Sequence, residues 1–73
     1  MNLERMKRLW PVARVIHEAR RDLAWGKNSA REPWPADDDR TLRAYPHDPI
    51  AYVDLALASA AALEDAGMLG AWK

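Results

Sequence analysis

The stretch DPIAYVDLALASAAALEDAG, residues 48–67, decides the fold class, because it joins helix boundaries at both ends to an apolar interior. Asp48 followed by Pro49 is typical of an N-cap and the first position of a helix. Gly67 is the kind of residue expected just past a helix end. The sequence therefore predicts a long helix between these boundaries and an all-α protein.

Apolar residues form two neighbouring stripes along this predicted helix. One stripe consists of Ile50, Val53, Leu57 and Ala60, and the other of Tyr52, Ala56, Ser59, Leu63 and Ala66. The alternative to a shared interface is an alanine-rich core helix, since alanine favours helices. We favour the interface, because one further helix in this chain cannot cover both stripes. We therefore expect a homodimer with an interface made of Val53, Ala56, Leu57, Ala60 and Leu63.

A second helical pattern covers the N-terminal part of the chain. Its apolar stripe consists of Leu9, Val12, Ile16, Ala19 and Leu23, at steps of three and four. Asn2 is expected to be the N-cap and Gly26 the residue after the last turn. Pro11 lacks an amide hydrogen and crowds the preceding turn, so the helix is either kinked near Lys7 or starts at Pro11. We favour a continuous, kinked helix.

A proline-rich connection, with the sequence EPWPADDDR over residues 32–40, links the two long helices. The aspartates at positions 37–39 suit the start of a short helix that ends before Pro46, so they need no metal ion to account for them. Pro33 and Pro35 hold Trp34 in an extended backbone, which lowers the entropy cost of fixing its ring. Trp34 is then either a lid over a small core, which we favour, or a residue that binds a partner.

Length and composition limit the possible architectures. The chain has 73 residues and no cysteine, so we expect a single helical domain over residues 1–73 with a small core that neither disulfides nor thiolate metal sites support. Oligomerisation is the usual remedy for so small a core. The longest apolar run, residues 55–63, is too short to cross a bilayer, and the N-terminal residues do not resemble a secretory signal. We expect a soluble, cytoplasmic protein.

The net charge is zero, but the two halves of the chain carry opposite charges. Residues 1–31 hold eight basic and three acidic side chains, whereas residues 32–73 hold three basic and eight acidic ones. We expect the halves to neutralise each other within the fold or across a dimer. The alternative is nucleic-acid binding by the first helix, which carries Arg14, Arg21 and neighbouring Lys7 on its polar side. A helix-turn-helix needs a shorter turn than this connection, and the acidic half would repel a duplex.

Enzymatic motifs are incomplete in this sequence. His17 and Glu18 begin like an HExxH zinc motif, but Arg21 stands where the second histidine must be. We instead expect His17 at the border of the apolar stripe. The two serines, Ser29 and Ser59, have no histidine nearby in sequence that could act as a base. We therefore expect no catalytic residue, no metal ligand and no cofactor.

The stretches YVDL, residues 52–55, and SAAALEDA, residues 59–66, resemble small helical-hairpin proteins that bacteriophages encode to disable host factors. The anti-quorum-sensing proteins of Pseudomonas phages are an example. The resemblance does not extend to the Pro-Trp-Pro connection. It implies a homodimer that acts by occupying a surface of a host protein.

These observations predict an all-α protein of two long helices, joined by a proline-rich connection with a short middle helix and assembled as a dimeric helical bundle. Its expected function is to bind a partner protein and to modulate or inhibit it. Trp34, Arg14 and Arg21 are the candidate partner-binding residues. A small nucleic-acid-binding regulator that uses the first helix is the alternative.

Overall fold

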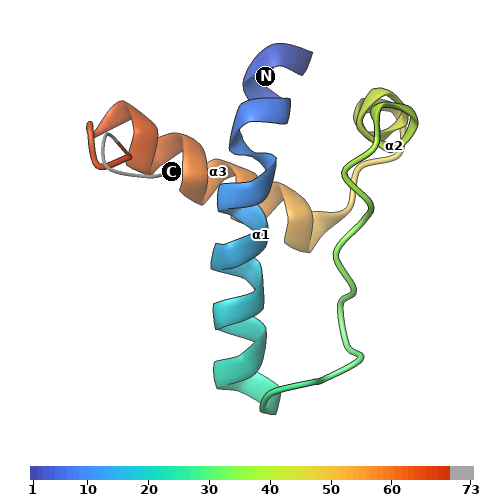
Figure 1. Ribbon diagram of the computed structural model, residues 1–73, viewed down its shortest axis with the longest axis vertical. Helices are drawn as coiled ribbons and strands as arrows, with labels where there is room; N and C mark the ends of the chain where they lie inside the picture. The colour runs from blue at the N-terminus through green and yellow to red at the C-terminus, as the bar shows by residue number, and fades with distance from the viewer. Residues whose placement is uncertain (70–73) are drawn as a thin grey trace.

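The structure, a computed structural model, describes residues 1–69 and contains only helical elements in that range (Figure 1). The elements are α1 (Leu3–Trp25), α2 (Asp39–Ala44), the 3₁₀ turn η1 (Tyr45–His47) and α3 (Ala51–Asp65). The prediction of an all-α protein is confirmed for these residues. No helix among the described residues is long and apolar enough to cross a membrane.

α1 begins and ends at the predicted residues. The Asn2 side chain accepts a hydrogen bond from the Arg5 amide at 2.8 Å, and Gly26 follows the last turn with φ +86°, a conformation that favours glycine. The helix is continuous through Pro11, which lies on its exposed side. Of the two interpretations left open by the sequence, the continuous helix is therefore the correct one.

α3 ends as predicted but begins later. Gly67 has φ +74°, and the amides of Gly67 and Met68 donate to the carbonyls of Glu64 and Leu63 at 3.0 and 2.9 Å, which is a Schellman motif. Asp48 is not the N-cap, however, because α3 starts at Ala51 and Ile50 precedes it.

The displaced start of α3 is explained by contacts with the 3₁₀ turn that precedes it. The Asp48 amide donates to the Tyr45 carbonyl at 3.0 Å and so completes η1 instead of opening α3. The Ile50 amide donates to the Tyr45 hydroxyl at 3.4 Å, which supplies a partner for the backbone at the true helix start. Both contacts are made by Tyr45, which lies outside α3, and the Asp48-Pro49 cap motif alone does not predict them.

α2 begins at the aspartate run. The Asp38 side chain accepts a hydrogen bond from the Thr41 amide at 2.7 Å, and Asp39 lies in the first turn. The Asp39 carboxylate also lies 2.7 Å from the Lys7 ammonium, which ties α2 to α1. The prediction that these aspartates start a short helix is confirmed.

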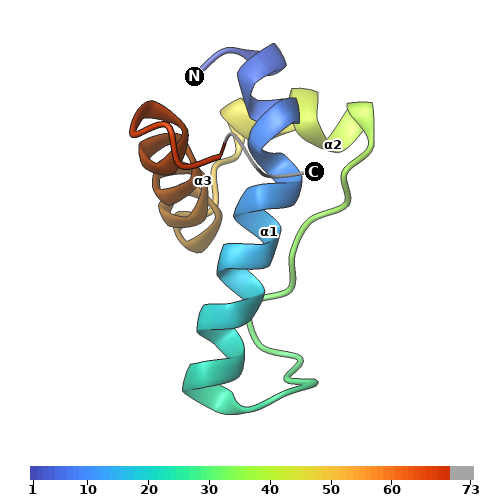
Figure 2. The same ribbon diagram turned by 60° about the vertical axis from the view of Figure 1, so that its left-hand side comes forward.

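α3 crosses α1 instead of running alongside it, as both views show (Figure 1 and Figure 2). The two largest dimensions of the Cα trace, 31 and 29 Å, are nearly equal, as expected when one long helix lies across another. The crossing covers the N-terminal half of α1, while the connection of residues 26–38 runs back beside its C-terminal half (Figure 2). The pair is therefore crossed and is not an antiparallel hairpin.

The core lies where α1, α2, η1 and α3 meet. Its buried apolar side chains are Met6, Leu9, Trp10, Val12, Ala13, Leu42, Tyr45, Val53, Ala56, Leu57 and Ala60. The predicted α1 stripe is only partly correct, because Ala19 is exposed and Leu23 is 90% exposed beyond the part that α3 covers. The buried face instead includes Trp10, which the predicted stripe left out.

The residues predicted to form the dimer interface lie mostly inside this core. Val53, Ala56, Leu57 and Ala60 are buried within a single chain, and Leu63 is partly buried. The reason is the crossing with α1, which places this face of α3 against residues of the first helix. Burial of these four side chains therefore needs no second copy, and the prediction that they form an intermolecular interface is corrected.

Candidate interaction surfaces

Trp34 lies against the core from the connection of residues 26–38. Its ring centroid is 5.1 Å from that of Trp10 and 5.3 Å from that of His17. The Tyr52 hydroxyl donates to the Pro33 carbonyl at 2.6 Å, which fixes the backbone just before Trp34. The half-buried Trp34 ring is thus packed as a lid. This geometry matches the first of its two predicted roles.

His17 is fully buried and is not at the border of a stripe, which corrects the expectation from sequence. Its ring stacks on Tyr52 with centroids 4.9 Å apart, and its Nε2 lies 2.7 Å from the Glu32 carbonyl oxygen. Because a carbonyl only accepts, Nε2 carries the proton of this bond. The sequence held a signal for this position, since Met6, Trp10, Ala13 and His17 follow one another at steps of four and three.

The predicted basic partner-binding residues differ in exposure. Arg14 is exposed, with its Nε 3.5 Å from the Glu18 carboxylate. The Arg21 side chain is only 14% exposed and lies between Glu18 and Asp22, at 3.8 and 4.0 Å. Arg21 is therefore largely buried, which corrects its expected place on an open polar face.

Opposite charges from the two halves of the chain meet where α1 crosses the C-terminal end of α3. Arg8 makes two hydrogen bonds of 3.0 Å to the two carboxylate oxygens of Glu64, and Arg5 binds both Glu64 and Asp65 at 3.1 and 2.8 Å. Arg20 likewise binds Glu32 at 3.2 Å. These pairs join opposite charges of the two halves within the fold, which is one of the two arrangements expected from the sequence.

This ion-pair cluster changes the acidity of Glu64. The hydrogen bonds from Arg8, together with the charges of Arg8 and Arg5, lower the pKa of Glu64, and desolvation opposes this only in part. The pKa of Asp39 is lowered in the same way by its hydrogen bond from Lys7. Both carboxylates therefore stabilise the fold only while they are ionised.

Acid should weaken the fold through these groups. Because the pKa of Glu64 is lower in the folded chain, its contribution is present above about pH 4.5 and is lost as the pH falls through the lowered value. We expect the melting temperature of Glu64→Gln to be lower than that of the natural chain at pH 7 and to fall less between pH 6 and pH 3. Glu4→Gln is the control, because no basic group within residues 1–69 forms an ion pair with Glu4. Parallel acid curves for the natural chain and Glu64→Gln would contradict this assignment.

One side of α3, opposite its buried residues, is apolar and exposed. It consists of Ala51, Leu55, Ala58 and Ala62, at steps of four and three. Leu55 is 54% exposed. We call these four residues the outer face of α3; the sequence signal for it was the apolar circumference of this helix.

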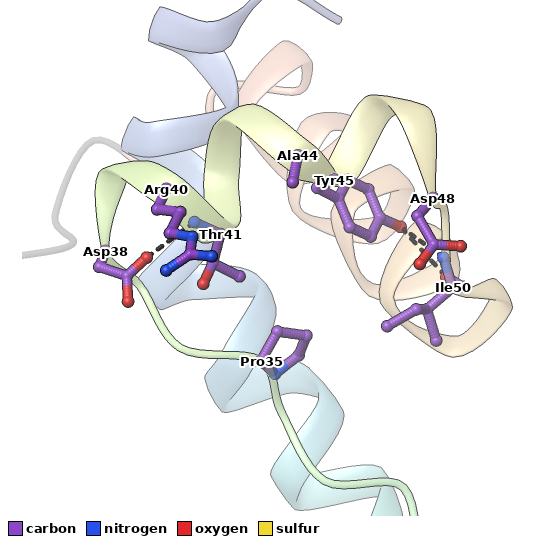
Figure 3. Close-up of a pocket in the computed structure, with 8 residues that line it drawn as sticks. All are labelled: Pro35, Asp38, Arg40, Thr41, Ala44, Tyr45, Asp48 and Ile50. Carbon is purple, nitrogen blue, oxygen red and sulfur yellow. Dashed lines mark hydrogen bonds between the residues drawn. The ribbon is translucent and has the colours of Figure 1, made fainter.

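Two hollows lie on either side of Tyr45. The larger, of about 440 Å³, is lined by Pro35, Asp38, Arg40, Thr41, Ala44, Tyr45, Asp48 and Ile50 (Figure 3). The smaller, of about 320 Å³, is lined by Met1, Met6, Tyr45, Pro46, Pro49, Asp54, Leu57 and Ala58. The Tyr45 hydroxyl donates to the Asp54 carboxylate, and burial together with this bond raises the pKa of Tyr45. Tyr45 is thus a fixed wall between the hollows, which the sequence analysis did not identify.

The described residues contain no cluster of three or more histidine or acidic side chains that could hold a metal ion. The serine hydroxyls are used locally, since Ser29 accepts from the Arg31 amide and Ser59 donates to the Leu55 carbonyl. Comparison with protein-family models, with curated proteins and with solved structures finds no match for this chain. The resemblance to phage-encoded inhibitors therefore stays a prediction, and geometry and charge support the function proposed below.

Proposed function

We propose that this chain is a small, cytoplasmic protein-interaction module that binds a partner protein and inhibits it by covering a surface. In this proposal the chain acts as a homodimer formed through the outer face of α3. The observation that supports it is the exposure of Leu55 among alanines on a helix with few charges. An inhibitor of a host factor, as the phage resemblance implies, would work in this way.

The composition of the outer face suits close helix packing. Alanine side chains allow two helix backbones to approach, so Leu55 from each copy could pack against Ala58 or Ala62 of the other. Four of the five residues expected at the interface from the sequence are buried in the core, so the interface we propose lies on the opposite side of α3. A core of this size would gain stability from the added apolar burial.

Nucleic-acid binding is the second candidate, and charge pairing argues against it. Arg5, Arg8, Arg14 and Arg20 each lie within 4.0 Å of a carboxylate, and so does Lys7. A phosphate would have to displace these carboxylates, which lowers the gain from releasing counterions. Sequence-dependent binding of a DNA duplex at physiological salt would favour this second function.

The proposed interface predicts a specific effect of Leu55→Glu. We expect sedimentation to give a dimer for the natural chain at micromolar concentration and a monomer for Leu55→Glu, because the substitution puts a charge into the apolar contact. Helix content should not change, since Leu55 lies outside the core. Leu23→Glu is the matched control, because Leu23 is also exposed but lies on α1, and this variant should remain a dimer. A monomeric natural chain would contradict the homodimer. If Leu55→Glu were still a dimer, the interface would not be the outer face of α3.

A further inference from the structure

The acidic side chains divide into two groups with different surroundings. Six lie within 4.0 Å of a basic group of residues 1–69, namely Glu18, Asp22, Glu32, Asp39, Glu64 and Asp65. The other five are Glu4, Asp37, Asp38, Asp48 and Asp54. Four of these five come from residues 37–54, where only Arg40 and Arg43 oppose them. Negative charge that the fold does not neutralise is therefore concentrated at this end of the molecule.

The larger hollow lies within this acidic region. Pro35, Ala44, Tyr45 and Ile50 give it apolar walls, and Asp38 and Asp48 stand at opposite ends of it (Figure 3). Arg40 lies at the Asp38 end, and its charge contributes to a lowered pKa of Asp38, after the larger effect of the hydrogen bonds from Thr41. Arg40 is the one basic residue among those that line the hollow, and Asp48, at the other end, makes no ion pair with a basic group of residues 1–69.

The walls of the hollow are held in place before any ligand binds. The buried Tyr45 ring packs edge-on against Trp10 with centroids 5.6 Å apart, and its hydroxyl is fixed between Asp54 and Ile50. Asp38 is fixed by its bond to the Thr41 amide. The Asp48 side chain, by contrast, makes no hydrogen bond or ion pair within residues 1–69. A ligand would thus meet a preformed apolar surface and one available carboxylate, which limits the entropy cost of binding.

We propose that this hollow binds a short basic and apolar segment of the partner protein. A lysine or arginine of that segment lies beside Asp48, and a neighbouring apolar side chain packs on Pro35 and Tyr45. Charge complementarity favours this occupant, because the carboxylates of residues 37–54 outnumber the two arginines there and would repel an acidic segment or a phosphate. The inference rests on the proposed function, for which it supplies the chemical class of the partner surface.

The probe is a capped pentapeptide, Ser-Leu-Lys-Val-Ser, titrated into the full chain while backbone amide signals are followed by NMR. We expect the signals of Thr41, Tyr45 and Ile50 to shift. An otherwise identical peptide with glutamate in place of lysine should shift them at least threefold less at equal concentration. A peptide with serine in place of leucine and valine should also bind more weakly, because the apolar walls then gain nothing.

Substitution of Asp48 tests the assignment directly. We expect Asp48→Asn to weaken binding of the lysine peptide about two- to fivefold at low salt, the effect of one exposed ion pair. Added salt should reduce the difference. Glu4→Gln removes a carboxylate that lies outside the hollow and likewise makes no ion pair within residues 1–69, and it should leave affinity unchanged. The proposal would be overturned if the chain bound the lysine and glutamate peptides with equal affinity, or if Asp48→Asn bound the lysine peptide as tightly as the natural chain. It would also be overturned if only the NMR signals of other residues shifted.

This test and the sedimentation test fail separately. A chain that is dimeric but does not bind the lysine peptide would support the homodimeric interaction module and contradict the proposed basic segment of the partner. A chain that is monomeric but binds the peptide through Asp48 would support the hollow as a binding site and contradict the homodimer.

Discussion

Trp34→Ala should lower the free energy of unfolding by about 3 kcal/mol, at the lower end of the range for removing a large core aromatic. The reason is that the half-buried ring covers Trp10 and His17, so its loss opens the core where α1 meets the connection. For a domain of this size that corresponds to a fall in melting temperature of roughly 12 to 24 °C. A thermal melt followed by circular dichroism measures it.

Two variants separate lost packing from other effects. Trp25→Ala removes another tryptophan, which is 43% exposed at the end of α1 with the Arg31 guanidinium 5.4 Å from its ring, and it should change stability much less. Trp34→Phe should recover most of the loss, because the Trp34 Nε1 is buried without a hydrogen-bond partner in residues 1–69 and its removal costs little. An equal, small effect of both alanine variants would mean that Trp34 is not a lid.

The sequence predicted those features of the fold that depend on local chemistry. Asn2, Gly26 and Gly67 each act at a helix boundary through contacts within a few residues, and each was found where expected. The aspartate run also starts a short helix as expected, with Asp38 as its N-cap. The start of α3 was wrong because Tyr45 takes part in it from outside the helix. The cap motif therefore failed where a side chain and a carbonyl of the preceding 3₁₀ turn took the place of the expected cap.

The packing of the helices could not be read from one sequence. Both long helices carry apolar stripes wider than one contact surface, and which part is buried depends on the crossing, which brings Trp10 and His17 inward and leaves Leu23 exposed. The same crossing puts Val53 and Ala60 inside the chain. Apolar periodicity indicates which faces of a helix are buried, but it does not indicate whether another helix of the same chain or a second copy buries them.

Ala60→Glu should unfold the chain at 25 °C. Ala60 is fully buried where α3 meets α1, so the longer side chain would both overfill the core and leave a carboxylate without solvent or a cation. The combined cost should exceed about 4 to 5 kcal/mol, which is comparable to the whole stability expected of a domain of this size. Loss of the helical signal in circular dichroism is the expected result.

Ala58→Glu is the matched control, two residues away on the outer face of α3. It should remain helical, with a loss of only a few tenths of a kcal/mol from repulsion by Asp54 four residues earlier. In sedimentation it should nevertheless become monomeric, because the outer face is the proposed contact between copies. A folded Ala60→Glu would show that α1 does not cover this face of α3. If Ala58→Glu unfolded as well, the fold itself would depend on the second copy, because a chain that is stable only as a dimer loses its structure when the contact is broken.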